Sequence, residues 1–343
     1  MDKKKKHVTA KRKKVIMLPE IRDHIIQPNR ITNAVSDYTL YQERVFTAIV
    51  YYLQNPIKLS FNGENYKQLD LFGSDMVMLN IPLKDISSPR EYPKVKESIR
   101  QMSSMNISIK YKDKDGKARE RTGGLFIADM PESGNGRGII RVKFDPMVAD
   151  LIIRLDRNAR GQAINYTRFA YQIAQGVKTK YAAKLYKLIS SWKSKGGFYM
   201  SKDELYTFLG VDGKYARYAD FKRRVLMPAH EELYEKSDCW FNCRAKDFEE
   251  RNGNEVVGFN FKVITPEFLE DGDKKVEQII SLLKTHFKCT DEDIEKISPI
   301  FSPEVFNYGR IVNKIQELSE KVDHTIKQKN RYVITSLVNE FLK

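Results

Sequence analysis

The chain has 343 residues, 41% of them hydrophobic, which predicts about two folded domains and excludes a largely disordered protein. Its formal net charge of +15 indicates a polyanionic partner. The chain has three cysteines, an odd number, which argues against a disulfide scaffold and for the reducing cytoplasm. It has no apolar run of about twenty residues, so we expect no membrane-spanning helix and no membrane partner.

Residues 1–24 form a basic tail. No apolar stretch follows its basic start, so it is not a secretory signal. It is either a flexible arm that lies along DNA phosphates or a solvated tail without a specific role. Its basic residues, opposed by Asp2 alone among the first fourteen, are Lys3, Lys4, Lys5, Lys6, Lys11, Arg12, Lys13 and Lys14.

From Ile31 the sequence begins a pattern that its second half repeats. In residues 37–53, apolar residues at helical spacing predict a helix with one buried face. NIPLKDIS corresponds to the strand and second helix of the later copy, and EYPKVKESIRQM corresponds to its basic helix. NISIKYK and GGLFIADM are then expected to enclose the turn DKDGKARERT as a hairpin wing, with GIIRVKFD as a further strand. The predicted apolar face consists of Leu40, Val45, Phe46, Ile49 and Leu53.

Residues 146–179 connect the two copies. The segments MVADLIIRL and YTRFAYQIA both have helical spacing of apolar residues, so we expect two helices here. Such a connection would fix the two wings relative to one another, although a shift in it would change their spacing.

The second copy begins with a helix from Lys178 that ends at Gly196-Gly197. Ser201, with Glu204 three residues on, has the pattern of a capping box that opens the next helix, and Gly210 closes that helix. The first helix is expected to bury Tyr181, Leu185, Leu188, Ile189 and Trp192, with Lys180, Lys184 and Lys187 largely off that face.

A basic helix follows in KYARYADFKRRVL. Its apolar stripe is Tyr218, Phe221, Val225 and Ala229, and Arg223 points most nearly away from it. Pro228 predicts a kink or short break. The segments CWFNCRAKDF and VGFNFKVIT are expected to be strands on either side of the turn EERNGNE. Helix, short strand, two helices and hairpin, in this order, make a winged helix.

This ordered set resembles plasmid replication initiator (Rep) proteins of the iteron-binding type, from about Ile31 to Pro266. The resemblance rests on YAAKLYKLI, on the SKDEL helix start, on Tyr-x-x-Phe-Lys-Arg-Arg-Val-Leu-x-Pro-Ala and on the Ser-Asp that follows. It implies an α+β fold of two tandem winged helices. We therefore expect an N-terminal winged helix (25–150) for dimerisation and phosphate contacts, a C-terminal one (151–268) for sequence-specific DNA binding, and a helical appendage of unknown role (269–343) after the acidic linker EDGDKK.

The resemblance also implies the function. Monomers would bind repeated origin sequences (iterons), promote opening of adjacent AT-rich DNA and recruit the host initiator and replicative helicase. A homodimer would bind an operator inverted repeat and repress its own gene. A transcriptional regulator without an origin role remains the alternative, and a nicking initiator or recombinase is the less favoured one.

A helix in the major groove needs long donors near its N-terminal end, because the Arg fork matches guanine O6 and N7 and Lys offers mainly charge. In the first copy, Pro93 and the scarcity of Arg favour phosphate positioning. The candidate DNA contacts of the second copy are Lys214, Arg217, Tyr218, Lys222, Arg223, Arg224, Lys246 and Arg251. Those of the first are Arg90, Lys94, Lys96, Arg100, Lys117, Arg119 and Arg121, with Lys112 and Lys114 near the wing.

No catalytic, cofactor or metal site is predicted. The chain has no Gly-x4-Gly-Lys-Ser/Thr loop, and its five histidines are scattered, without the closely spaced pair of rolling-circle nucleases. His230 reads as a partly buried or surface helical residue. Cys239 and Cys243 are expected to share one strand face and to serve core packing, because a zinc site needs three or four ligands.

Overall fold

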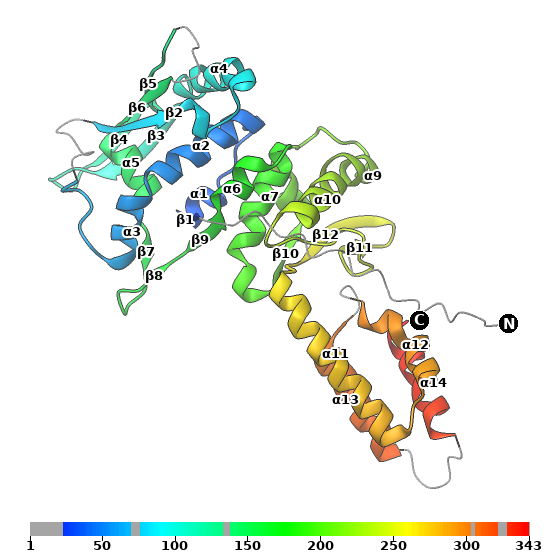
Figure 1. Ribbon diagram of the computed structural model, residues 1–343. Coiled ribbons are helices and arrows are strands. Elements are labelled where there is room, and N and C mark those ends of the chain that lie inside the picture. Colours follow the sequence, from blue (N-terminus) through cyan, green and yellow to red (C-terminus); the bar gives the residue numbers. More distant parts are fainter. Residues whose placement is uncertain (1–22, 70–75, 133–137, 303–305, 322–327, 343) are drawn as a thin grey trace. The chain divides into compact units, whose positions relative to one another are not determined.

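The computed structural model describes residues 23–69, 76–132, 138–302, 306–321 and 328–342 (Figure 1). The basic residues of the tail lie outside these ranges. The chain divides into two compact units, one holding the residues up to Lys195 together with Ser201–Trp240, and the other Gly196–Met200 together with Phe241–Lys343. No helix among the described residues is both long and apolar enough to cross a bilayer.

The first part of the chain alternates helices with short antiparallel strands. Its sheet has the order β2-β6-β5, and a separate ribbon pairs β3 with β4. Helix α2 packs against α4 and buries Val45, Phe46 and Ile49, and Leu53 is buried directly after its end, as the sequence predicts. Leu40, also expected on this face, is half-buried. The elements are β1 (His24–Pro28), α1 (Asn29–Thr32), α2 (Leu40–Tyr52), α3 (Gln54–Asn62), β2 (Val77–Pro82), η1 (Leu83–Asp85), η2 (Pro89–Glu91), α4 (Tyr92–Ser103), β3 (Asn106–Lys112), β4 (Ala118–Gly124), β5 (Ile127–Asp129) and β6 (Ile139–Phe144).

The predicted wing has a different second strand. β3 pairs with Ala118–Gly124, of which residues 118–122 were expected to be turn and only Gly123 and Gly124 belong to the expected strand. The real turn is short and contains Gly116 with a φ of +77°. The rest of the expected strand contributes β5, which pairs with β6 instead of β3. The prediction was wrong because every residue of β4 is exposed, so the strand has no apolar alternation to reveal it.

The connecting segment is only partly helical. Its elements are α5 (Pro146–Ile153), β7 (Asp156–Arg157), β8 (Ala163–Ile164), β9 (Tyr166–Ala170) and α6 (Tyr171–Gly176). The prediction for MVADLIIRL is confirmed, but YTRFAYQIA is half strand, because β9 pairs antiparallel with β1. Buried Thr167 donates to Asn29 Oδ1 at 2.7 Å and lies 3.0 Å from Thr32 Oγ1, and these bonds satisfy its hydroxyl within the pairing.

The helices of the second copy follow in the predicted order. They are α7 (Lys180–Ser191), η3 (Lys193–Lys195), β10 (Gly197–Ser201), α8 (Lys202–Leu209), α9 (Tyr218–Phe221), the π-helical η4 (Lys222–Leu226) and α10 (Met227–Lys236). α7 ends at Ser191, before the glycine pair. The capping box of Ser201 and Glu204 is present, and Gly210 ends α8 in the left-handed region with a φ of +65°.

Replacing Ser201 with alanine is expected to lower the free energy of unfolding by about 0.5–2 kcal/mol. The hydroxyl accepts the Glu204 N–H at 3.3 Å, and the alanine side chain leaves that donor at the helix start without its cap. Urea denaturation measures the change. The control is Ser103→Ala, whose hydroxyl donates to the Arg100 carbonyl within its own helix and caps no helix start, and it should change stability by less than about 0.5 kcal/mol. Equal effects of the two substitutions would contradict the capping role.

The segment Cys239–Phe248 is not a strand, contrary to the prediction. It forms turns in which Asn242 Oδ1 accepts the Arg244 N–H at 2.9 Å, and residues 239–241 are all buried rather than alternating. Cys239 and Cys243 are buried free thiols, in agreement with core packing. The hairpin itself consists of β11 (Glu249–Asn252) and β12 (Glu255–Lys262), in a sheet of order β10-β12-β11.

Helices make up the rest of the chain. The prediction of an acidic linker is wrong, because residues 270–275 are helical and lie within α11. α11 contacts α13, and α12 contacts α14 (Figure 1). These helices share a core of their own that includes Ile279, Leu283, Ile315 and Leu337. The elements are α11 (Pro266–Phe287), α12 (Asp291–Ile297), η5 (Ser298–Phe301), α13 (Tyr308–Lys321) and α14 (Lys329–Phe341).

Candidate nucleic-acid interface

The segment Tyr218–Lys236 carries four of the candidate contacts of the second copy, Tyr218, Lys222, Arg223 and Arg224. Its apolar side is buried through Phe221, Val225, Ala229 and Leu233, each at most 1% exposed. Tyr218, also expected in that stripe, is only half-buried. Because one side is held by the core, the charged side chains on the other side are turned outward, and Arg217, Arg223 and Arg224 are exposed.

Aromatic rings support the N-terminal end of this segment. The Phe221 ring centroid lies 4.4 Å from that of Tyr206, 5.8 Å from that of Tyr215 and 6.4 Å from that of Tyr218. Tyr215 and Tyr218 therefore take part in packing. The backbone that presents the arginines rests on a packed aromatic group.

The arginines differ in their surroundings. Arg217 occupies the N-cap of α9 with extended backbone, so the helix begins later than the predicted start at Lys214. Arg223 is 69% exposed and donates to Asp220 Oδ1 at 2.6 Å. That bond leaves most of the guanidinium donors directed to solvent. Lys222 is half-buried, and Arg224 is exposed.

Between α9 and α10 the helix widens into one π-helical segment, η4. Pro228 follows two residues after it and has no N–H to donate to the Arg224 carbonyl, which its ring would also crowd. A π turn moves that carbonyl away at the cost of one extra residue in the turn. The predicted break near Pro228 therefore takes the form of a wider turn, and this turn contains Arg223 and Arg224.

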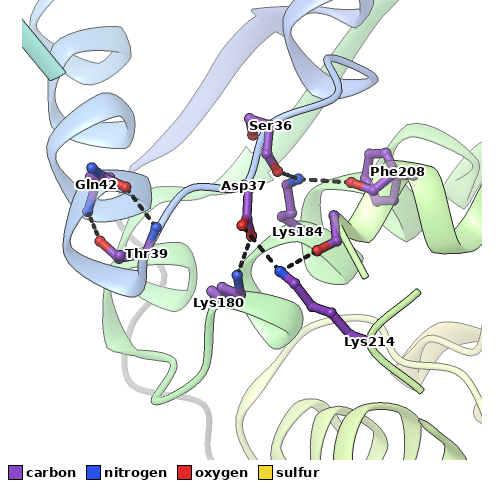
Figure 2. A network of polar contacts seen from close by, with 9 residues as sticks. Ser36, Asp37, Thr39, Gln42, Lys180, Lys184, Phe208 and Lys214 are labelled. Atoms are coloured by element: carbon purple, nitrogen blue, oxygen red, sulfur yellow. Dashed lines mark hydrogen bonds and ion pairs between the residues drawn. The ribbon is translucent and has the colours of Figure 1, made fainter. Parts of the chain in front are cut away.

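Lys214 is engaged within the protein. It lies in the turn after α8 and donates to the Gly210 carbonyl at 2.6 Å and to Asp37 Oδ2 at 3.1 Å. Lys180 of α7 donates to the other oxygen of Asp37 at 2.6 Å, and Figure 2 shows the two ammonium groups converging on this carboxylate. The hydrogen bond from Lys180, with a further one from Lys214, holds the pKa of Asp37 below its usual value. Lys214 thus ties the loop before α2 to the second copy.

Two lysines of α7 that the sequence places off its apolar face are in fact buried. Lys184 donates to the carbonyls of Ser36 and Phe208, the latter at 2.7 Å (Figure 2). Lys187 forms an ion pair with Glu43 of α2 at 2.9 Å. Burial of the Lys184 ammonium lowers its pKa to about 8, because water no longer stabilises the charge. Both lysines are therefore structural.

Lys184→Met is expected to change how stability depends on pH. Between its folded pKa of about 8 and the ordinary value of 10.5, Lys184 binds fewer protons in the folded chain than in the unfolded one, so the free energy of unfolding rises with pH across this window. The methionine variant loses this rise. Urea denaturation at about pH 7.5 and about pH 9.5 measures it, and an identical pH dependence in both proteins would contradict the assignment.

Lys246 and Arg251 lie near the hairpin of the other unit. Lys246 is exposed in the turn before β11. Arg251 is exposed on β11 and donates through Nε to Glu249 Oε2 at 3.1 Å. Both are on the surface, where a phosphate can reach them.

In the first copy, the candidates divide between α4 and the β3–β4 ribbon. Arg90 lies in η2 and is exposed. On α4, Lys94 lies over the Tyr41 ring, Lys96 donates to the Pro131 carbonyl at 2.5 Å and Arg100 pairs with Glu97 at 3.1 Å. Only part of this set faces solvent freely, because Lys96 is half-buried.

The ribbon carries several of its charges on exposed backbone. Lys117 is exposed beside the turn, and so are Lys112 and Lys114. Arg119 pairs with Asp113 at 2.9 Å, and Arg121 pairs with Asp145 at 2.8 Å. The structure thus brings the basic residues together on a two-stranded ribbon, as predicted, although the strand partner differs.

One basic element was not predicted. The hairpin β7–β8 carries Arg157 and Arg160, and Arg168 lies exposed on β9. The two helices expected in residues 146–179 leave residues 156–165 between them without an assigned structure, so this hairpin was not predicted. The signal that would have found it is Asn158 followed by Gly161, residues typical of a tight turn.

Two family models match the chain. One, described as initiator replication protein, WH1, matches residues 24–190, and the other, described as initiator Rep protein, WH2, matches residues 201–263. The chain belongs to the initiator Rep family. Its fold is therefore two tandem winged helices in an α+β chain, and its function is to initiate plasmid replication, as the resemblance implied. No curated protein matches this Rep chain.

The Rep family is a DNA-binding one, and neither matched model belongs to an enzyme family. Among the residues that the structure describes, no group of three or more His, Cys, Asp or Glu is arranged to hold a metal ion. His230 is buried on α10.

Proposed function

We propose that this Rep initiator recognises repeated origin sequences with the segment Tyr218–Lys236, which enters the major groove. The observation that carries the proposal is the exposure of Arg223 and Arg224 on a helical segment whose opposite side is buried, with exposed Arg217 at the N-cap of that segment. Arg is the residue best suited to reading guanine, because its fork matches O6 and N7. Lys222, Lys246 and Arg251 would contact phosphates.

The first winged helix would add phosphate contacts and serve as the interface of a homodimer. Its helix α4 is not rich in arginine, which favours contacts that position the protein on the phosphates over contacts that read bases. The exposed basic residues available for this are Arg90, Lys94, Arg100, Lys117, Arg119 and Arg121. Monomers would then bind iterons, with two winged helices covering about two successive major grooves. Dimers would bind an operator inverted repeat and repress the gene of the initiator.

The bound protein would then open the AT-rich DNA beside the iterons. It would recruit the host initiator and the replicative helicase in the bacterial cytoplasm. The division into a basic tail (1–24), winged helices at 25–150 and 151–268 and an appendage at 269–343 belongs to the proposal as well. The appendage has its own apolar core, which suits a separate role.

Footprinting on the DNA that flanks the gene, with a single-strand-sensitive reagent in the same reaction, tests the proposal. Evenly spaced protected repeats with reactive AT-rich DNA beside them are the expected result. Protection of a promoter inverted repeat alone would leave a transcriptional regulator. A cut strand, or a strand covalently linked to the protein, would indicate a nicking enzyme.

A further inference from the structure

The hairpin β7–β8 is a short ribbon with a firmly held tip. Figure 1 shows it as an extension of its own near α3. At the tip, the Asn158 side-chain oxygen accepts the N–H groups of Arg160 and Gln162, both at 3.0 Å, and Gly161 takes a φ of +75°. The Gly161 N–H also donates to the Asn158 carbonyl at 2.9 Å. These bonds fix the backbone of Arg160.

The base of the hairpin is tied to the body of the first winged helix. Arg157 donates to the carbonyls of Ser60 and Phe61 at the end of α3, the latter at 3.1 Å. Arg30 of α1 donates to the Arg154 carbonyl at 2.6 Å and pairs with Asp156. Because both ends of the ribbon are held, the position of its tip relative to α1 and α3 is set before any ligand arrives.

Among residues 23–69, 76–132 and the other described ranges, the positive charge at the tip meets no counterion. Arg160 is exposed, and within the described part of the chain nothing pairs with its guanidinium. The nearby carboxylate Asp156 is already occupied by Arg30 and by the Asn165 amide at 3.3 Å. Arg168, exposed on β9, lies over the Phe61 ring of α3 at 5.1 Å and adds positive charge.

A single guanidinium on a narrow, preformed tip is suited to insertion into the minor groove of DNA. The minor groove is only about 6 Å wide. Where A-tracts narrow it, its negative potential increases and attracts inserted Arg side chains. Arg suits such a site better than Lys because its guanidinium is less strongly hydrated. A major groove, by contrast, is read by several side chains of a helix or ribbon.

We propose that the β7–β8 hairpin is a minor-groove arm that inserts Arg160 into A·T-rich DNA next to the sequence read by the second winged helix. The inference rests on the proposed function, because the chain must already be docked on a duplex. It gives the segment between the two winged helices a role in recognition, and it adds a preference for flanking sequence that the major-groove helix does not supply.

The test uses the full-length protein and duplexes that carry one footprinted repeat with either an A-tract or a G·C block on each side in turn. Fluorescence anisotropy measures affinity. The wild type should bind the A-tract-flanked duplex more tightly than the G·C-flanked one. Arg160→Ala should lower the affinity for the A-tract-flanked duplex roughly tenfold and leave the affinity for the G·C-flanked duplex nearly unchanged. Arg160→Lys should recover only part of the preference, because it restores charge alone.

Two controls sharpen the result. Replacing the flanking A·T pairs with inosine·cytosine keeps the minor-groove edge and alters the major-groove edge, so the preference should persist. Arg154→Ala removes the same charge from the base of the hairpin, where Arg154 pairs with Asp150 at 3.3 Å, and should leave the flank preference intact.

An equal loss on both flanks would make Arg160 a phosphate contact and overturn the proposal. No loss on any duplex would overturn it too and would favour an acidic protein surface as the partner of the arm. A wild-type protein that fails to distinguish the repeat from a scrambled one would instead contradict the proposed function. The two failures are therefore separable.

Discussion

Replacing Lys187 with methionine is expected to lower the free energy of unfolding by about 3–5 kcal/mol. The side chains of Lys187 and Glu43 are 6% and 7% exposed, and their charged atoms lie 2.9 Å apart. The substitution keeps most of the volume but leaves the Glu43 carboxylate buried without its counterion. An unpaired buried charge is the costly outcome, because neither water nor a partner then stabilises it.

Urea denaturation of the single variants and of Lys187→Met/Glu43→Leu measures the effect. The double variant should recover much of the loss, since an apolar pair of similar size needs no counterion. Arg100→Met serves as the matched control: its pair with Glu97 is exposed, and the change should cost at most about 1 kcal/mol. Additive losses in the double variant would show that the two residues do not act as a pair.

Arg223→Ala is expected to weaken binding to the specific site by about 1–3 kcal/mol and to relax the preference at one base pair. The reason is the exposed guanidinium of Arg223, which Asp220 holds on one side while its other donors face outward. Affinity for scrambled DNA should fall much less, because a base contact contributes little where the base is wrong. Competition binding against single-base variants of the repeat measures both quantities.

The control for this experiment is Arg331→Ala, an exposed arginine on α14 whose removal changes the net charge by the same amount. It should affect specific and scrambled DNA alike and only slightly. If Arg223→Ala lowers both affinities equally, Arg223 contacts a phosphate. The reading of bases would then fall to Arg217 and Arg224.

Local patterns in the sequence predicted the parts of the fold that local chemistry decides. The cap at Ser201, the end of α8 at Gly210 and the buried stripe through Phe221 and Val225 all depend on residues a few positions apart. The exposed arginines of the candidate site follow from the same stripe. Helix and strand periods were sufficient there because one face of each element is buried.

Elements decided by distant partners could not be predicted in this way. β4 has no buried residue on either face, and it is a strand because β3 lies beside it. β9 is a strand because of β1, which is far away in the sequence. The burial of Lys184 and Lys187 depends on carbonyl and carboxylate groups that no spacing within α7 reveals.

The pairing of Glu43 with Lys187 also affects the order in which the parts of the chain can fold during synthesis. The two residues are 144 positions apart, so at about 5–20 residues per second the ribosome needs roughly 7–30 s to add the lysine after the glutamate. The partner of strand β1, β9, is synthesised after an almost equal delay. During synthesis, the first winged helix must therefore keep this carboxylate hydrated and its first strand unpaired. The final packing of α2 is completed only when α7 has left the ribosome, so the two winged helices mature together.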